Sequence, residues 1–472
     1  MTYRSLERAN AYFYDPARRA AAVRRHGGVC YLSSGVNHLR APSVLLDIAA
    51  RELRERMLVE NYTAPGGAPA VVAAIAFETH ERLGVSAFGA IGPANIAMTA
   101  GATGALAFAF RYLAEIAGAR TALVLGLNYS YFSTICDEHR IAYRTCCSEE
   151  PDRILPSAAE AVALIARHCP DIVVLTQPTN PSGEVYGAEE LDTLIAAVAA
   201  TESWLVFDEV PDLAHPGEAE RPHPFPAKTE AFPGRLIWIN SFSKSRSLAG
   251  LRAGWLIADR PVVDFVRRHN ERLLWSPVHA GASALVLDMV LRAAARRVRD
   301  ASLVVDDPND GGAIEHRVVR AARRAGRYLR LFSPYSDDFS RPGDLWAFLD
   351  AAVDWPQAFR RYEADLAATG AVCAANWRAF ESRLGDRLRS MIAAPAGFNH
   401  CVNFDGGLGE WAFARQAFDD AGLDFYTESV FADHDREDSS DYWVRISTAN
   451  QTEIFAAGCD SLSDFLDRGH GA

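Results

Sequence analysis

Lys244 is one of only two lysines in a chain of 472 residues that otherwise uses arginine for its cations. It lies in Ser241-Phe242-Ser243-Lys244, eight residues before Arg252. A guanidinium has no accessible neutral form, whereas a partly buried lysine amine can lose its proton and attack a carbonyl carbon to form a Schiff base. Lys244 is therefore the candidate nucleophilic amine. The other lysine, Lys228, lies in the Pro- and Glu-rich stretch 218–233, which is predicted to be a solvated loop.

A second feature that could do chemistry is the small-residue segment Thr99–Leu106, which is predicted to be a turn opening into a helix that runs to about Ala117. Free backbone N–H groups at a helix start form an anion site that suits a phosphate. Here Gly101 and Ala102 allow close approach, and Thr103 adds a hydroxyl donor. Taken alone, the segment is explained equally well by a tight contact between a helix and a sheet.

Four polar or aromatic side chains stand at the ends of apolar runs or within them. Asp208 ends one such run, where a carboxylate either caps a loop or meets a cation. Asn180 lies in Gln177–Gly183 and could also be a simple turn residue before proline. Tyr129 could stack on a flat ring or only cover a sheet end. Arg445 is a charge in a strand-like apolar context, and such an arginine usually pairs with a carboxylate in bidentate fashion.

The elements that must position these residues are short apolar strands alternating with helical periodicity between residues 68 and 300. This pattern predicts an α/β layer with a mainly parallel sheet. Most of the candidate residues follow a run at its C-terminal edge, which is where open α/β sheets bind ligands. The runs are Thr121–Leu127, Asp171–Leu175, Trp204–Phe207, Leu236–Asn240 and Trp255–Ala258.

The remaining sequence predicts a second, smaller α/β unit built from both termini, as expected for a chain too long for one small core. We place the large domain at 66–300, and the small domain at 1–65 and 301–472. A segment at about 300–360 is predicted to be an irregular insertion with a surface helix at Arg317–Arg330. It could be surface decoration or a lid over the pocket mouth.

Composition excludes several classes of function. The formal net charge of -12 and the absence of a basic block argue against nucleic-acid binding. The eight cysteines include no Cys-x-x-Cys pair, which predicts reduced thiols in the cytoplasm, and no metal-ligand set is found. No apolar stretch is long enough for a signal peptide or a membrane span.

Order and spacing join these residues into one pattern. Asn180, Asp208 and Lys244 follow one another at intervals of 28 and 36 residues, and Lys244 begins a Lys-x-x-x-x-x-Gly-x-Arg-x-Gly segment that contains Arg252. At this point the chain resembles the class I/II aminotransferases, which are fold-type I pyridoxal-phosphate enzymes. The resemblance covers nearly the whole chain except about 300–360. It implies a large domain with a mainly parallel sheet flanked by helices, a smaller domain built from both termini, and pyridoxal 5'-phosphate as coenzyme.

The resemblance also implies roles for the catalytic group. Lys244 would hold the coenzyme as a Schiff base and move a proton at the substrate Cα. Asp208 would pair with the protonated pyridine nitrogen, which makes the ring an electron sink. Asn180 would hydrogen-bond the phenolic oxygen and take part in substrate binding, and Tyr129 would stack on the ring.

Phosphate, substrate and partner contacts follow from the same resemblance. Arg445 would bind the α-carboxylate of an L-amino acid, helped by the backbone near Gly35. Tyr62 would reach the phosphate bound by a second subunit, so a homodimer with active sites at the subunit interface is expected. The residues implied for the phosphate itself are Ala102, Thr103, Ser241 and Arg252, and Gly101 and Ser243 are further implied coenzyme-binding residues.

One position departs from the family pattern. The family usually has a tyrosine three residues after the pyridine-binding aspartate, where it hydrogen-bonds the phenolic oxygen, and this chain has Pro211 there. Proline has no donor to offer. Pro211 thus leaves the reaction type open without affecting coenzyme binding. The leading hypothesis from the resemblance is an aminotransferase that breaks the Cα–H bond of an L-α-amino acid. The alternative is elimination, replacement or C–C bond formation in specialised metabolism, as in the aminocyclopropane-carboxylate synthases, which use S-adenosylmethionine and have a stretch similar to Ala100–Gly104.

Two non-enzymatic hypotheses are weaker. Some transcription regulators have an aminotransferase-like domain, but they have a basic helix-turn-helix domain ahead of it. Only about 60 residues precede the predicted large domain here, and they match the aminotransferase N-terminal arm. A scaffold that has lost its chemistry is disfavoured because Lys244 and Asp208 are both present.

Overall fold

A computed structural model describes most of the chain, and the fold below refers to these residues alone. No helix in this part of the chain has both the length and the apolar character needed to cross a bilayer. Lys228 lies outside the described residues, as do residues 300–313 and 333–340 of the predicted insertion. The described ranges are 2–55, 61–84, 91–213, 234–277, 280–299, 314–332, 341–394, 396–405, 407–432 and 439–468.

The chain divides into two compact units, each assembled from separate segments. The first unit consists of Met1–Leu39, Leu113–Ala214 and Thr369–Ala472, and the second of Arg40–Tyr112 and His215–Ala368. Seven strands, β1 to β7, make up a mostly parallel sheet, and we describe its strands unit by unit. The boundaries predicted from sequence, 66–300 for the large domain, remain a prediction.

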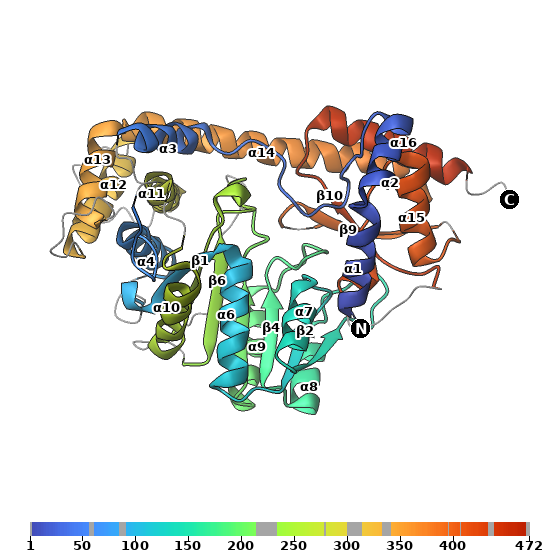
Figure 1. Cartoon of the computed structure of the whole chain (residues 1–472), viewed down its shortest axis with the longest axis horizontal. Helices are drawn as coiled ribbons and strands as arrows, with labels where there is room; N and C mark the ends of the chain where they lie inside the picture. Colours follow the sequence, from blue (N-terminus) through green and yellow to red (C-terminus); the bar gives the residue numbers. More distant parts are fainter. Residues whose placement is uncertain are drawn as a thin grey trace. The chain divides into compact units, whose positions relative to one another are not determined.

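The first unit contains four short parallel strands; β2, β4 and β5 are almost wholly buried, whereas the edge strand β3 is buried only at its last residue. Their order is β3-β2-β4-β5, and Thr176 lies opposite Asp208 in the register of β4 and β5. Helix α8 packs on α9 and on β2, and α7 packs on β3 (Figure 1). The bounds are β2 Thr121–Leu125, α7 Tyr131–Glu138, β3 Ala142–Cys146, α8 Ala158–His168, β4 Ile172–Thr176, α9 Ala188–Ala200 and β5 Trp204–Asp208.

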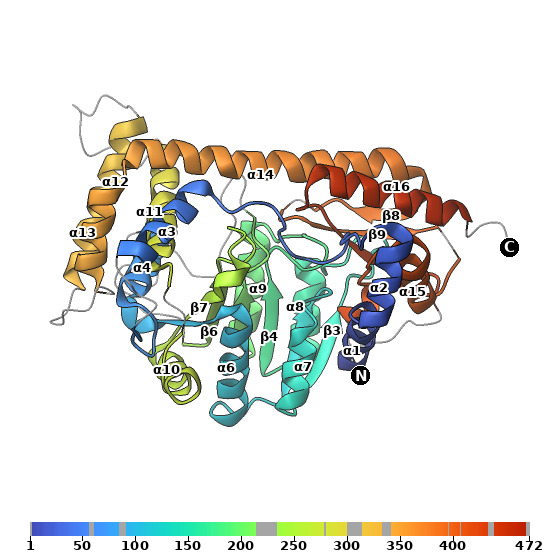
Figure 2. The same cartoon turned by 45° about the horizontal axis from the view of Figure 1, so that its top comes forward.

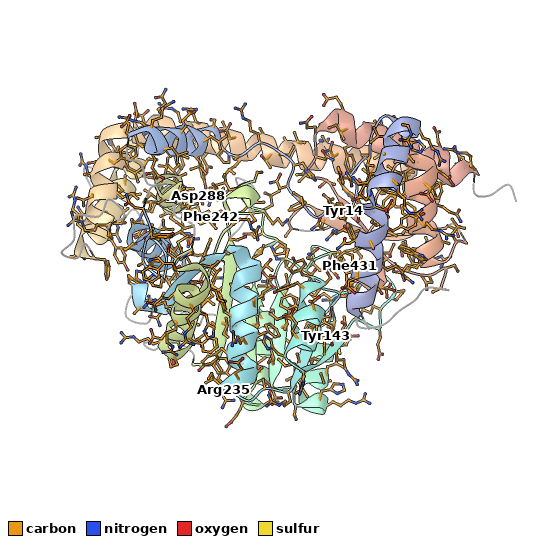
Figure 3. The ribbon with its side chains drawn as sticks, viewed as in Figure 1. Tyr14, Tyr143, Arg235, Phe242, Asp288 and Phe431 are labelled. Carbon is orange, nitrogen blue, oxygen red and sulfur yellow. The ribbon has the colours of Figure 1, made fainter. Side chains whose placement is uncertain are left out.

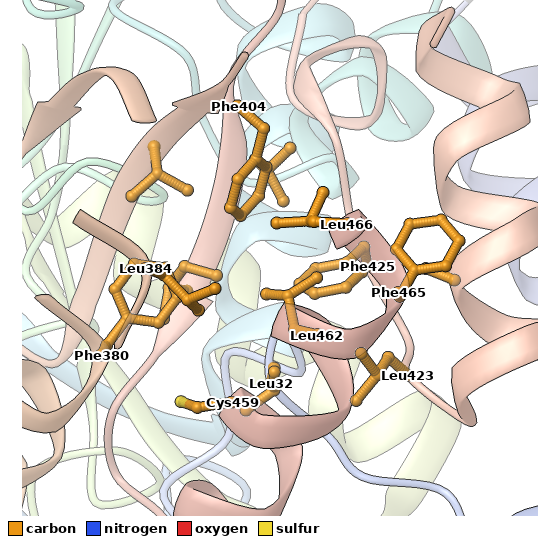
Figure 4. Packing of buried hydrophobic residues seen from close by; sticks show 14 of the residues in the cluster. Leu32, Phe380, Leu384, Phe404, Leu423, Phe425, Cys459, Leu462, Phe465 and Leu466 are labelled. Atoms are coloured by element: carbon orange, nitrogen blue, oxygen red, sulfur yellow. The ribbon is translucent and has the colours of Figure 1, made fainter. Parts of the chain in front are cut away.

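The same unit contains an antiparallel sheet of order β10-β9-β8. One face of this sheet packs against helices from the C-terminal part of the chain to form a core that includes Leu32, Phe380, Phe404 and Leu462 (Figures 2 and 4). The bounds are α1 Thr2–Phe13, α2 Pro16–His26, β8 Leu388–Ile392, β9 Asn399–Phe404, α15 Glu410–Ala421, β10 Val444–Ser447 and α16 Thr452–Arg468, and α14 Trp355–Leu384 belongs to this unit from Thr369 onward.

In the second unit, β7 pairs antiparallel with both β1 and β6. Helix α10 packs on β1 and β7, while α11 packs between α3, α4 and α12. The bounds are α3 Ser43–Glu55, α4 Pro69–Leu83, β1 Ile96–Ala100, α6 Gly101–Glu115, β6 Leu236–Ser241, β7 Ala253–Ala258, α10 Arg260–Leu274, α11 Ala282–Arg299, α12 Ile314–Leu331 and α13 Pro342–Ala352.

The α/β class and the mainly parallel sheet are confirmed, and two details of the prediction are wrong. Thr99 and Ala100 belong to β1 rather than to a turn, so α6 begins directly at Gly101. The segment 300–360 is not irregular where it is described, because it forms α12, α13 and the start of α14. The many arginines of α12 favoured the prediction of a surface helix, but the helix also has an apolar stripe with helical spacing. This stripe includes Val318, Ala321 and Ala325 and is fully buried.

Candidate active site

Three predicted residues of the first unit follow the carboxyl ends of its parallel strands, as the apolar runs indicated. Tyr129 follows β2, Asn180 follows β4, and Asp208 is the last residue of β5. Parallel strands bring their carboxyl ends to one edge of a sheet. The structure therefore brings the predicted ring-binding side chains to the same edge.

Asp208 is a buried carboxylate with little local compensation. Its side chain is 4% exposed, and its Oδ1 accepts a hydrogen bond from the Val210 N–H at 2.9 Å. Burial raises the pKa of Asp208 to about 7, an effect that the nearby Glu209 increases and the Val210 N–H opposes. A cation placed beside this carboxylate would remove most of that cost, since an opposite charge favours the ionised form.

Arg445, on β10, is the second buried charge of this unit. Its Nε and Nη2 donate to the Ser33 carbonyl at 3.1 and 2.6 Å, and its Nη1 donates to the Asn180 Oδ1 at 3.0 Å. The guanidinium carbon lies 4.8 Å from the centroid of the Phe431 ring, a residue labelled in Figure 3. Burial lowers the pKa of Arg445 to about 10, so the side chain remains charged at neutral pH.

Arg445 does not make the bidentate ion pair expected from the sequence within the described part of the chain, although the buried Asp424 interacts with it electrostatically. Among the residues that the structure describes, no carboxylate lies within ion-pair distance of this guanidinium. Three of its five N–H groups are used, and two remain for a ligand. Gly35 explains the space around it, because a Cβ at that position would lie 2.7 Å from the Arg445 Cζ and Nη1.

Asn180 is oriented by the same contact. Arginine can only donate, so the atom of Asn180 that faces Arg445 must be the carbonyl oxygen, and the amide nitrogen remains a donor. Tyr129 presents its ring near Tyr131 and Phe132, with centroid distances of 6.1 and 6.5 Å. Tyr129 is partly exposed.

The second unit holds the predicted anion-binding residues. The Gly101 N–H donates to the Arg252 carbonyl at 2.8 Å, and a Cβ on Gly101 would lie 2.7 Å from the Arg252 Nη2. The guanidinium of Arg252 therefore lies against the start of α6. Gly254 makes this approach possible, because a Cβ there would lie 2.4 Å from the Ala102 nitrogen. Ala102 and Thr103 are partly exposed at this helix start, where N–H groups lack intrahelical acceptors.

Lys244 lies in a turn that follows β6. Ser241 ends the strand, and its Oγ accepts a hydrogen bond from the Ser243 N–H at 3.2 Å. The Ser241 N–H in turn donates to the Asn240 Oδ1 at 2.7 Å. Ser241 and Ser243 are buried and Lys244 is half-buried, so the amine stands at the edge of an ordered turn.

The structure reveals a charged network beside this turn that sequence analysis missed. The Arg246 Nε donates to the Asp288 Oδ1 at 2.6 Å, and the Arg292 Nε donates to Oδ2 at 2.7 Å (Asp288 is labelled in Figure 3). The Tyr362 hydroxyl also donates to Oδ1 at 2.6 Å. Arg246, Asp288 and Tyr362 are all buried. Arg246 is two residues from Lys244, so this network fixes the turn. The sequence signal that could have indicated this network is Asp288, a charged residue in the apolar first half of α11.

Tyr62 is far more exposed than a typical tyrosine, at 75%, and its ring meets Trp275 edge-on with centroids 6.4 Å apart. Trp275 is itself 57% exposed. Exposed aromatic side chains of this size mark interaction surfaces.

Comparison with known proteins identifies the family. Residues 28–298, more than half of the chain, match the model of aminotransferase class I and II. The chain belongs to the class I and II aminotransferases. The resemblance inferred from Lys244, Asp208 and Asn180 is thereby confirmed at the level of the family, while the role of each residue stays a prediction.

Curated class I and II aminotransferases match part of the chain. The histidinol-phosphate aminotransferase of Mycolicibacterium vanbaalenii is 26% identical over 239 residues, which covers 50% of this chain and 59% of that protein. The aspartate aminotransferase of Thermotoga maritima is 28% identical over 258 residues, with 53% and 64% covered. The matches thus span about three fifths of the length of these relatives.

Solved aminotransferase structures resemble the whole chain in fold. An aminotransferase from Mycobacterium tuberculosis has a TM-score of 0.65 at 20% identity and covers 97% of both chains. The aspartate aminotransferase from Thermotoga maritima has a TM-score of 0.65 at 18% identity, covering 99% of this chain and 97% of that one. These likenesses establish the fold-type I architecture.

Pyridoxal 5'-phosphate is the coenzyme of class I and II aminotransferases with this fold, and the residues of each unit fit parts of it. Asp208 is a buried carboxylate that needs a cation, as a protonated pyridine nitrogen would be. The start of α6 and the Arg252 guanidinium form a small cationic cradle that a Cβ at Gly101 would fill. A phosphate dianion suits such a cradle.

Proposed function

We propose that the chain is a pyridoxal-phosphate-dependent aminotransferase that acts on an L-α-amino acid. Family membership supports this proposal, and the observation that favours it most is Arg445. Asp424 is a buried carboxylate near enough to interact with this guanidinium electrostatically, but no described carboxylate is within ion-pair distance and two N–H groups are left over, which suits an α-carboxylate. Gly35 lets the guanidinium lie directly against the backbone, because any side chain at that position would collide with it.

The coenzyme, when bound, supplies an electrophilic carbon and an electron-withdrawing ring. We propose that the Lys244 amine holds the coenzyme covalently and, once released by the substrate amine, takes the proton from the substrate Cα. Asp208 accepts the N–H of the ring nitrogen and keeps it protonated. The free amide nitrogen of Asn180 donates to the phenolic oxygen, and Tyr129 covers one ring face. Asn180 and Arg445 also orient the substrate carboxylate.

We assign the phosphate to the second unit. Free N–H groups of Ala102 and Thr103 at the start of α6 donate to its oxygens, and the Arg252 guanidinium adds a fixed positive charge. Gly101 keeps the cradle open, and the hydroxyls of Ser241 and Ser243 are further donors. These contacts would hold the phosphate end of the coenzyme in place.

Replacing Arg445 tests the substrate assignment. An Arg445→Lys variant keeps one positive charge but loses the planar, bidentate donor set. We expect KM for the amino acid to rise by about 10- to 100-fold, on the scale of one or two charge-assisted hydrogen bonds. The coenzyme affinity should remain within about threefold of the original. Steady-state kinetics and a dialysis measurement of coenzyme binding check this, and an unchanged KM would contradict the assignment.

We further propose a homodimer in which Tyr62 of one copy contributes to the site of the other. The large exposed area of Tyr62 and Trp275 supports this, because aromatic side chains are enriched at protein interfaces. Sedimentation equilibrium should give about twice the monomer mass of 51.6 kDa, and Trp275→Glu should shift the equilibrium toward monomer. A monomeric native protein with full activity would contradict the proposal.

One experiment separates transamination from its alternative. Purified protein loaded with pyridoxal 5'-phosphate is mixed with a panel of amino acids and S-adenosylmethionine, without an acceptor, and the products are identified by mass spectrometry. Transamination yields one equivalent of 2-oxo acid per site and resumes when a 2-oxo acid acceptor is added. Release of a side-chain leaving group without acceptor dependence would instead support elimination or replacement, which Pro211 keeps open. We propose a cytoplasmic setting for either reaction.

A further inference from the structure

We infer that Asn128 is a further positioning residue of the coenzyme site: its side-chain N–H donates to a water held on the Asp208 carboxylate and so orients that carboxylate toward the ring nitrogen. This inference rests on the proposed function, in which Asp208 pairs with the coenzyme. It concerns residues of the first unit only.

The orientation of the Asn128 amide is fixed by two donors. The Tyr129 N–H donates to the Asn128 Oδ1 at 2.8 Å, and the Thr176 hydroxyl donates to the same oxygen at 2.8 Å. A backbone N–H can only donate, so the accepting atom must be the amide oxygen. The side-chain nitrogen therefore points away from these two groups.

That nitrogen is buried and has no acceptor. Asn128 is 0% exposed, and its Nδ2 has no hydrogen-bond partner within the described part of the chain. Buried donors without partners are rare because each loses its bond to water and gains nothing in exchange. Such a donor, next to the tyrosine predicted to stack on the coenzyme ring, indicates that a bound water accepts its hydrogen bond.

The register of the sheet indicates where the acceptor lies. Thr176, which holds the Asn128 oxygen, is the direct β-bridge partner of Asp208. Partners in neighbouring strands are about 4.8 Å apart and their side chains share one face of the sheet. The Asn128 amide is thus one side chain away from Asp208, beyond direct contact but within reach of a single water.

Asp208 has capacity for that water. Its Oδ1 accepts one hydrogen bond from the Val210 N–H, while an ionised carboxylate offers about four acceptor sites. A water that accepts from Asn128 and donates to Asp208 would leave the carboxylate free to face a ring N–H. Buried waters typically bridge polar groups that are otherwise unsatisfied.

The decisive test compares Asn128→Ala with a matched variant of a buried asparagine in the same unit. Asn403→Ala is suitable because the Asn403 Nδ2 already has an acceptor, the Asp441 Oδ1 at 2.6 Å. For each protein we measure the dissociation constant of pyridoxal 5'-phosphate and the rise in melting temperature that saturating coenzyme produces. We also measure the ¹⁵N chemical shift of ring-labelled coenzyme across pH.

We expect Asn128→Ala to weaken coenzyme binding by about 5- to 10-fold, the effect of one hydrogen bond. It should also reduce the coenzyme-induced rise in melting temperature and move the ring-nitrogen signal toward the unprotonated form. Asn403→Ala should lower the melting temperature of the free protein but leave the coenzyme constants within twofold. Equal effects of the two variants on binding, or an unchanged nitrogen signal in Asn128→Ala, would overturn the inference.

An Asp208→Ala variant distinguishes failure of this inference from failure of the proposed function. If Asp208→Ala abolishes the protonated ring-nitrogen signal while Asn128→Ala changes nothing, the Asn128 inference alone is wrong. If Asp208→Ala also leaves binding and signal unchanged, the assignment of Asp208 is wrong, and the Asn128 inference is overturned with it.

Discussion

A Lys244→Ala variant is expected to lose the visible absorbance band of the bound coenzyme and at least about 10³-fold of its turnover, because one amine both holds the coenzyme and moves the proton. Lys244→Arg should be equally inactive, since a guanidinium has no neutral form at accessible pH. Lys228→Ala, at the only other lysine, is the matched control and should behave as the original protein. Absorbance spectra and initial rates measure all three.

Covalent attachment provides an independent check of the same prediction. Borohydride reduction of the original protein with pyridoxal 5'-phosphate should fix the coenzyme to the peptide that contains Lys244, and mass spectrometry should find no such adduct in Lys244→Ala. Small primary amines in solution should restore part of the lost turnover because they replace the missing base. An intact visible band in Lys244→Ala would remove the proposed mechanism.

The strands that carry the site could be predicted because parallel strands are buried on both faces. Trp204–Asp208 is an apolar run that ends in a carboxylate, and Leu236–Ser241 is an apolar run that ends in a serine. The polar residue marks the carboxyl end of each strand in the sequence. Ile96–Ala100 was missed because Thr99 and Ala100 resemble a small-residue turn. Local composition cannot tell that Ala100 pairs with Ala253 across the sheet.

Contacts distant in the chain could not be predicted. The motif around Lys244 revealed the amine, but Arg246 meets its counter-charge 42 residues later, on a helix whose register no local pattern defines. Asn128 could not be recognised either, because a missing acceptor is a property of three-dimensional packing. The order of the motifs therefore identified the residues that the family shares. The residues that hold them in place could be found only from the three-dimensional structure.

The buried network beside Lys244 leads to the second large expected effect. Asp288→Asn removes one negative charge but keeps a side chain of nearly the same size. Arg246 and Arg292 are then left without their counter-charge. Breaking a buried ion pair from one side costs about 3–5 kcal/mol. We expect the free energy of unfolding, measured in urea at pH 7, to fall by about that amount. Coenzyme binding should weaken as well, because the Lys244 turn loses its anchor.

Controls and pH separate charge from packing in this network. Tyr362→Phe removes one hydrogen bond to Asp288 and should cost only about 1 kcal/mol. Burial alone would raise the pKa of Asp288, but Arg246 and Arg292 hold it below its usual 3.8. The carboxylate therefore stabilises the fold at every pH above 3.8, and its contribution disappears only as the pH falls through the lower native value. The stability difference between Asp288→Asn and the original protein should thus be constant from pH 8 to about 5 and shrink only in stronger acid. A difference that vanishes near neutral pH would show that the pair is not what holds the turn.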